Sequence, residues 1–149
     1  MTTVGTPRRA VWGCLLLALC PGCWGSGSAP KTIKVLGRVT YKGESVTAGT
    51  IVLQPVKPAE GYPRRPATGT LRGDGSYELS TFESGDGVVP GEYGVAILSF
   101  LSGPDPENPH VSMVWNVPKK YASHITSGQT ASIPPNAGAT VELNFDLEE

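Results

Sequence analysis

Residues 139–147 read Ala-Thr-Val-Glu-Leu-Asn-Phe-Asp-Leu, the clearest two-residue alternation in the chain. Apolar side chains occupy every second position from Val141 to Leu147, and polar side chains stand between them. Because successive side chains of a β-strand point to opposite faces, this pattern predicts a strand with one buried and one exposed face. We therefore expect the domain to end in a β-strand.

Earlier runs of strand-forming residues, each bounded by turn residues, predict further strands at 33–40, 50–56, 67–72, 77–82, 92–101 and 129–133. Tight-turn signals at Lys42-Gly43 and at 73–76 (Gly-Asp-Gly-Ser) separate neighbouring runs, because glycine accepts the positive φ that such turns need. No segment after residue 33 keeps a helical period. Seven or so short strands at this spacing predict an all-β domain folded as a two-sheet sandwich.

Prolines mark where regular structure is expected to stop. Pro55 lacks an N–H, so we expect 50–56 to be an edge strand or to end there. Residues 102–109 hold three prolines and predict a loop. Residues 111–117 predict a short strand or an extended cover strip, and residues 118–122 predict one turn of helix or a loop.

Composition limits the function classes. The chain has 149 residues, enough for one domain, and its 19 Gly and 14 Pro indicate frequent turns. The formal net charge is −1, and loss of Arg8 and Arg9 with residues 1–22 would make it −3. Since the sequence holds no basic patch, we expect no nucleic-acid partner.

Residues 1–22 have the features of a signal peptide. Arg8 and Arg9 give a positive start, and residues 10–19 form an apolar run that contains Leu-Leu-Leu-Ala-Leu. This run is much shorter than the about 20 residues that a membrane-spanning helix needs. A buried core helix is the other interpretation, but a helix beside a Gly/Pro/Ser-rich break would have nothing to pack on.

All the cysteines, Cys14, Cys20 and Cys23, lie in this N-terminal segment, and the rest of the chain has none. Gly22-Cys23 resembles a bacterial lipobox, in which a small residue precedes a cysteine that is acylated and becomes the mature N-terminus. We therefore expect a lipid on Cys23, with the membrane as a partner through this anchor.

Cys20 is the alternative site of acylation. It has Leu17 at the preferred upstream position, but the bulky Leu19 directly precedes the thiol. Either choice leaves a Gly/Ser-rich segment before the first strand. We expect this flexible tether to occupy residues 23–32 and the folded domain to occupy residues 33–149.

Short motifs in a fixed order resemble the opening of carboxypeptidase-regulatory-like domains: 37–43 (Gly-Arg-Val-Thr-Tyr-Lys-Gly), 49–53 (Gly-Thr-Ile-Val-Leu), 74–79 (Asp-Gly-Ser-Tyr-Glu-Leu) and 89–93 (Val-Pro-Gly-Glu-Tyr). The whole chain is similar to small lipoproteins of planctomycete bacteria, which share stretches like 117–122 (Val-Pro-Lys-Lys-Tyr-Ala), 126–128 (Thr-Ser-Gly) and 145–147 (Phe-Asp-Leu).

This resemblance covers nearly all of residues 33–147. It implies a Greek-key, transthyretin-like (prealbumin-like) sandwich of about seven strands, and it implies no known catalysis. The chain departs from the family at Ser45-Val46, where Pro-Val is usual, and residues 101–115 look like an insertion.

Residues of catalytic or metal-binding type are scattered. His110 and His124 have no His or Cys at metal-ligand spacing, and no Gly-x-Ser-x-Gly motif occurs. An acid–base pair would need two carboxylates about 5–9 Å apart, chosen from Asp74, Glu83, Asp86 and Glu92. Asp74-Gly75 and Asp86-Gly87 could contribute to a calcium site, but EF-hand spacing is absent. We expect no catalytic residue, metal or cofactor.

Two segments are candidate binding surfaces. Tyr62 lies close to Arg64 and Arg65, a combination suited to anionic or sugar ligands, although a solvated loop is the simpler interpretation. Met113 and Trp115 lie in a long loop, and tryptophan is enriched at interfaces. The alternative for Trp115 is that it covers an open end of the core.

The expected function is that of an exported, lipid-anchored and non-enzymatic binding or structural module of the bacterial cell envelope, facing the periplasm or the exterior. Its further partner would be an envelope protein or a glycan. One alternative is a carbohydrate-binding accessory domain, which would need Tyr62, Trp115 and Tyr121 on one exposed face. Another is a secreted hydrolase whose site is built from loop carboxylates.

Overall fold

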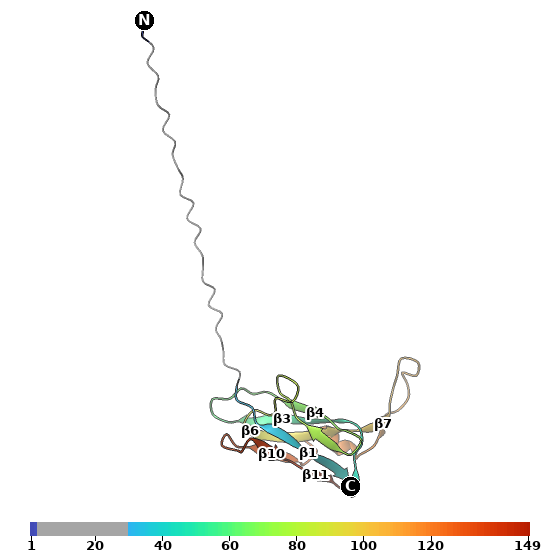
Figure 1. Ribbon diagram of the computed structural model, residues 1–149. Helices are drawn as coiled ribbons and strands as arrows, with labels where there is room; N and C mark the ends of the chain where they lie inside the picture. The colour runs from blue at the N-terminus through green and yellow to red at the C-terminus, as the bar shows by residue number, and fades with distance from the viewer. Residues whose placement is uncertain (3–29) are drawn as a thin grey trace.

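The computed structural model describes residues 1–2 and 30–149, and this part of the chain is an all-β domain (Figure 1). Its strands form one five-stranded sheet, one four-stranded sheet and one two-stranded sheet, an arrangement consistent with a β-sandwich. Residues 3–29, which include the three cysteines and most of the predicted signal peptide and predicted tether, lie outside the described residues. Within those residues, no helix has the length and apolar character to cross a membrane.

The five-stranded sheet is built around β1 (Lys34–Tyr41). On one side, β1 pairs in parallel with the last two strands of the chain, β10 (Thr140–Glu142) and β11 (Phe145–Leu147). On the other side it pairs antiparallel with β5 (Ser76–Glu78) and with β2 (Glu44–Ser45), which follows the expected tight turn. The predicted strand at 33–40 is confirmed, and its central position explains why Val35 and Val39 are fully buried.

The four-stranded sheet is antiparallel, in the order β4-β3-β6-β9. Its strands are β3 (Thr50–Pro58), β4 (Ala67–Thr70), β6 (Gly91–Leu98) and β9 (Thr130–Ile133). A bridge between Thr68, on β4, and Ser80, just after β5, joins the two larger sheets, with reciprocal main-chain hydrogen bonds of 2.9 Å. The sheets are therefore linked by main-chain bonds along this edge.

Alternate residues of the strands form one hydrophobic core. Its members share nearly complete burial and come from both larger sheets; the largest of those that are fully buried are Tyr77, Ile51, Leu53, Leu79, Ile97, Ile133 and Leu147. The prediction that alternating apolar residues face inward is confirmed for these strands. Each such side chain contributes about 1.5–3 kcal/mol on full burial, so the core is the main source of stability.

Pro55 neither ends its strand nor lies on an edge strand, so that expectation is wrong. β3 continues to Pro58 and lies between β4 and β6. The ladder with β6 shifts register between Pro55 and Lys57, and the pairing with β4 stops at Leu53. A proline is tolerated at this place because the strand is irregular there and has no strand partner on its β4 side.

The strand predicted for residues 139–147 is interrupted at Leu143 and Asn144. The carbonyl of Leu143 turns toward β1 and occupies the space that a Cβ would fill at Gly37. The hydroxyl of Tyr77, a buried residue of β5, donates a hydrogen bond to this carbonyl at 2.5 Å. The break therefore depends on a glycine and a tyrosine from two other strands.

Hydrogen bonding continues across the break. The N–H of Leu143 donates to the carbonyl of Leu36 at 2.9 Å, and the N–H of Arg38 donates to the side-chain oxygen of Asn144 at 2.9 Å. An amide side chain thus takes the place of a main-chain acceptor. Pairing resumes in the same register at β11, which keeps Phe145 and Leu147 facing the core.

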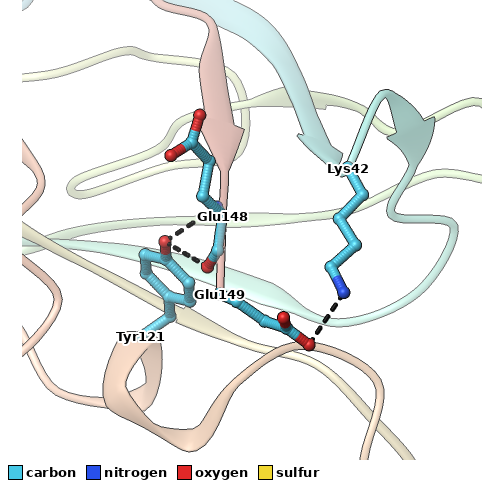
Figure 2. Close-up of polar contacts among 4 residues, drawn as sticks. All are labelled: Lys42, Tyr121, Glu148 and Glu149. Carbon is cyan, nitrogen blue, oxygen red and sulfur yellow. Dashed lines mark hydrogen bonds and ion pairs between the residues drawn. The ribbon is translucent and has the colours of Figure 1, made fainter.

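The 3₁₀ turn η1 (Lys119–Ala122) packs against β6 and carries the buried Tyr121. Its hydroxyl donates to the carbonyl of Glu148 at 2.8 Å and accepts from the N–H of Glu148 at 2.9 Å (Figure 2). Beside it, the ammonium of Lys42 pairs with Glu149 at 2.8 Å, which raises the pKa of Lys42 and lowers the pKa of Glu149. Tyr121 thus connects η1 and β6 to the end of β11.

Candidate binding surface

The third sheet is a hairpin of β7 (Phe100–Ser102) and β8 (Val114–Trp115), separate from the sandwich. Phe100 pairs with Trp115 and Ser102 pairs with Val114, with a bulge between the two pairs. In Figure 1, β7 and the loop that follows it extend away from the two larger sheets. We call residues 100–115 the arm.

The arm is fixed to the sandwich at its base. Ser99 is fully buried between β6 and β7, and its hydroxyl donates to the carbonyl of Ala48 at 2.5 Å. Asn116 binds Ser99 twice, since its side-chain NH₂ donates to the hydroxyl at 3.0 Å and its main-chain N–H donates to the carbonyl at 3.1 Å. The arm therefore projects from a defined point of the fold.

Large apolar side chains lie exposed along the arm, with the exposed fractions Phe100 50%, Leu101 70%, Val111 46%, Met113 41% and Val114 48%. None of them belongs to the core cluster. Exposed apolar residues that occur singly are ordinary, but a contiguous group marks a surface that another molecule covers. The arm therefore holds more exposed large apolar side chains than any other segment of the described domain.

Trp115 lies in the arm, half-buried opposite Phe100, and is not a member of the core cluster. The expectation that it covers an open end of the core is therefore wrong. The side chains that join the core from this segment are the aliphatic Val117 and the aromatic Tyr121, which follow Trp115 in the chain.

The other candidate surface, at Tyr62, Arg64 and Arg65, is occupied largely by internal contacts. The guanidinium of Arg64 donates to the carbonyl of Pro55 at 2.9 and 3.2 Å and to the carbonyl of Val56 at 3.3 Å. These bonds satisfy the side of β3 that β4 no longer covers. Arg65 lies over the ring of Phe82 at 5.7 Å.

The aromatic platform required for carbohydrate binding is not formed. Tyr62 is half-buried and Trp115 lies in the arm, but Tyr121 is only 3% exposed and its hydroxyl is bound to Glu148. A sugar ring stacks on an exposed aromatic face, which Tyr121 does not offer. The alternative of a carbohydrate-binding accessory domain therefore lacks the exposed face of three aromatic residues that it would need.

The turn carboxylates hold their own loops. One oxygen of Asp86 accepts from the N–H of Thr81 at 2.8 Å, and the other accepts from Phe82 and Glu83 at 2.9 and 3.2 Å. Partial burial raises the pKa of Asp86, but these amides lower it more, and the net shift is downward. The side chain of Ser76 lowers the pKa of Asp74 most, and the N–H of Ser76, which donates to its carboxylate at 2.9 Å, lowers it further.

Glu78 is the centre of a cluster of charges beside β5. Its carboxylate lies 2.8 Å from Lys34 and 3.7 Å from Arg72, and the Lys34 contact is the larger cause of its lowered pKa. A shallow groove lies beside it. Most of the residues that line this groove are threonines and serines: Thr50, Thr68, Thr70, Ser80 and Ser84. Here too the charged groups already have partners within the domain.

The histidines lie apart from these groups. His110 is exposed in the arm, whereas His124 is half-buried, with its Cβ close to Gly94. In the part of the chain that the structure describes, no group of three His, Cys, Asp or Glu residues could hold a metal ion.

Sequence reasoning found only half of the arm. Met113 and Trp115 were identified from their position in a long loop, but Phe100 and Leu101 were predicted only as the end of the strand at 92–101. The signal that separates them is Ser99, a polar residue that ends the run of inward-facing apolar residues Tyr93, Val95 and Ile97.

No family model matches the chain, and no curated protein matches it. Among solved structures, a 9R-lipoxygenase from Cyanothece PCC8801 is similar over 80% of this chain, with 12% sequence identity and a TM-score of 0.40. The chain spans 16% of the length of that enzyme. A likeness this distant carries no argument about activity.

Proposed function

We propose that the chain is an exported, lipid-anchored protein of the bacterial cell envelope whose β-domain acts as a non-enzymatic binding or structural module. The observation that carries the binding role is the arm, because it exposes five large apolar side chains on a rigidly based hairpin. Apolar groups in this arrangement gain about 25 cal/mol per Å² when a partner removes them from water.

The anchor is proposed at Cys23, after removal of residues 1–22 as a signal peptide. The positive start, the short apolar run and Gly22 before the thiol support this assignment. Acyl chains contribute about 0.8 kcal/mol per buried methylene, so two or more chains hold a protein stably on a bilayer. Cys20 is the alternative acylation site.

We further propose a Greek-key, prealbumin-like sandwich for the domain. Its support is the motif order of the sequence together with two facing sheets whose inner strands, β1, β3 and β6, come from separate parts of the chain. Two sheets with this share of non-sequential neighbours are typical of such architectures.

Metabolic labelling with radioactive palmitate tests the anchor. We expect label on the wild-type protein and on Cys20→Ser, which serves as the matched control, and no label on Cys23→Ser. Label that is lost in Cys20→Ser and kept in Cys23→Ser would move the anchor to Cys20. An unlabelled wild-type protein that keeps residues 1–22 would contradict the anchored location.

Capture of envelope partners tests the binding role. We expect Leu101→Ser to reduce by at least tenfold the crosslinking of the full chain to its envelope partner. Ile125→Ser is the matched control, because Ile125 is 81% exposed and lies outside the arm. Equal crosslinking of the two variants would remove the arm from the binding role.

A further inference from the structure

The arm is incomplete as a sheet. Only two residue pairs join β7 to β8, at Phe100–Trp115 and Ser102–Val114. Among the described residues, neither strand pairs with a further strand on its outer edge. An isolated two-stranded hairpin is marginal in water, whereas three or more strands with a shared apolar face are stable. Its unpaired N–H and C=O groups also form a template on which a further strand can pair.

Charge is distributed unevenly along the arm. The tip, residues 103–110, carries Asp105 and Glu107 and contains no lysine or arginine. The base is followed within a few residues by Lys119 and Lys120, which are exposed on η1. Neither the tip carboxylates nor these two lysines form an ion pair within the described residues. The tip of the arm is thus negative, whereas the segment that follows its base carries two exposed lysines.

We propose that the arm pairs with the arm of a second copy of this chain, antiparallel and about a two-fold axis. In this arrangement the acidic tip of each copy lies beside Lys119 and Lys120 of the other, and the apolar side chains of the two hairpins cover one another. A two-fold interface must be self-complementary, and a surface whose two ends bear opposite charge meets that condition when it pairs antiparallel.

The strength of the dimer follows from its size. Each arm offers five apolar side chains that are about half exposed, which places the contact at the small end of specific interfaces, below about 1,200 Å² in total. Such interfaces are typical of reversible association. Copies that share one membrane surface have a raised effective concentration, which favours the dimer further.

A lipid bilayer is a less suitable occupant. Insertion of the arm would bring the carboxylates of Asp105 and Glu107 toward the acyl chains, because they stand at the projecting end. Charged groups are costly in that environment and are disfavoured beside anionic headgroups. The inference rests on the proposed function only in treating the arm as a binding surface, and it does not depend on acylation.

Charge reversal in two full-length copies with different tags tests the pairing. The copies are expressed together, crosslinked in intact cells with a long amine-reactive reagent and co-precipitated; Lys34 and Lys57 remain available in every variant. We expect the amount of co-precipitated partner to fall at least tenfold when both copies carry D105K/E107K, and likewise when both carry K119E/K120E. A mixture of one variant with the other restores opposite charges at both ends and recovers it to within about twofold of wild type.

Glu60→Lys is the control, because it reverses an exposed carboxylate outside the arm, and we expect no loss. Wild-type copies that fail to co-precipitate, or mixed variants that do not recover, would overturn the pairing. If Leu101→Ser abolishes capture of another envelope protein while the copies remain separate, the binding role stands and the second copy is excluded. Flotation of the Cys23→Ser variant, with the arm unchanged, together with lipid vesicles would instead identify the bilayer as the occupant and exclude the pairing.

Discussion

Gly37, in β1, faces the break between the last two strands, β10 and β11. The carbonyl of Leu143 fills the space that a side chain would occupy at Gly37, and it accepts a hydrogen bond from the hydroxyl of Tyr77. A carbonyl turned into the core needs a donor, because an unsatisfied buried acceptor costs about 1–3 kcal/mol. Glycine and tyrosine are therefore required together at this point.

We expect Gly37→Ala to lower the free energy of unfolding by about 3 kcal/mol, because main-chain atoms must move to admit the new methyl group. Tyr77→Phe is expected to lower it by about 1–3 kcal/mol through the unsatisfied carbonyl. Gly73→Ala is the matched control, because nothing lies within 4 Å of its Cβ position and its φ is not positive. Urea denaturation measures all three, and equal effects of the two alanine substitutions would contradict this role of Gly37.

Asp86 gives a second expectation at this scale, in the dependence of stability on pH. Its folded-state pKa lies below the ordinary value of 3.8, because three main-chain amides outweigh the effect of burial. Its contribution is therefore full above that value and is lost as the pH falls through the folded pKa. We expect wild type to exceed Asp86→Asn in urea midpoint at pH 6 and the difference to shrink as the pH falls below 3.8; a constant difference would exclude this linkage.

At the scale of elements, η1 links the core to the C-terminal strand through Tyr121. The main-chain carbonyl and the main-chain N–H of Glu148 both bind the hydroxyl of Tyr121. This single oxygen therefore satisfies the residue after β11 as a neighbouring strand would. The neighbouring ion pair of Lys42 and Glu149 is exposed, and water screens such pairs strongly.

We expect Tyr121→Phe to lower the free energy of unfolding by about 1 kcal/mol and to speed amide hydrogen exchange at Glu148. Lys42→Met is the matched control in the same region and is expected to leave the urea midpoint unchanged. If hydrogen exchange at Glu148 is the same in Tyr121→Phe as in wild type, the hydroxyl does not hold this end of β11.

The elements also show what the sequence could predict. Alternation located most strands correctly, because it reflects a local property, the direction of successive side chains. The breaks were not predictable in this way: the one at Leu143 depends on a hydroxyl 66 residues away. Likewise, Arg64 binds the carbonyl of Pro55 from outside the strand. Periodicity places Phe100 on the face opposite to Ile97, but it could not show that no other element covers Phe100.

At the scale of the whole molecule, the sandwich and the arm are separable. No residue of 100–115 belongs to the core cluster, and the arm meets the rest of the fold mainly at Ser99 and Asn116. The sequence predicted this segment as a loop or cover strip, but its independence could be seen only once the core members were known.

We expect replacement of residues 103–110 by Gly-Gly to leave the thermal midpoint within about 2 °C of wild type, because it removes no core side chain. Val35→Ala is the comparison, since it empties part of a fully buried site and should lower the midpoint by several degrees. Circular dichroism during heating measures both. A large drop on loop replacement would show that the arm contributes to the core.

The pairing of β1 with β10 and β11 sets the order in which the domain can be completed. Arg38 and Asn144, bonded across this pairing, stand 106 positions apart. A chain that is synthesised from its N-terminus therefore presents β1 long before its parallel neighbours exist, and the sheet stays open along that side until residues 140–147 have been made. Such long-range closure is slow, so β1 keeps one unpaired edge throughout the synthesis of the segment between them.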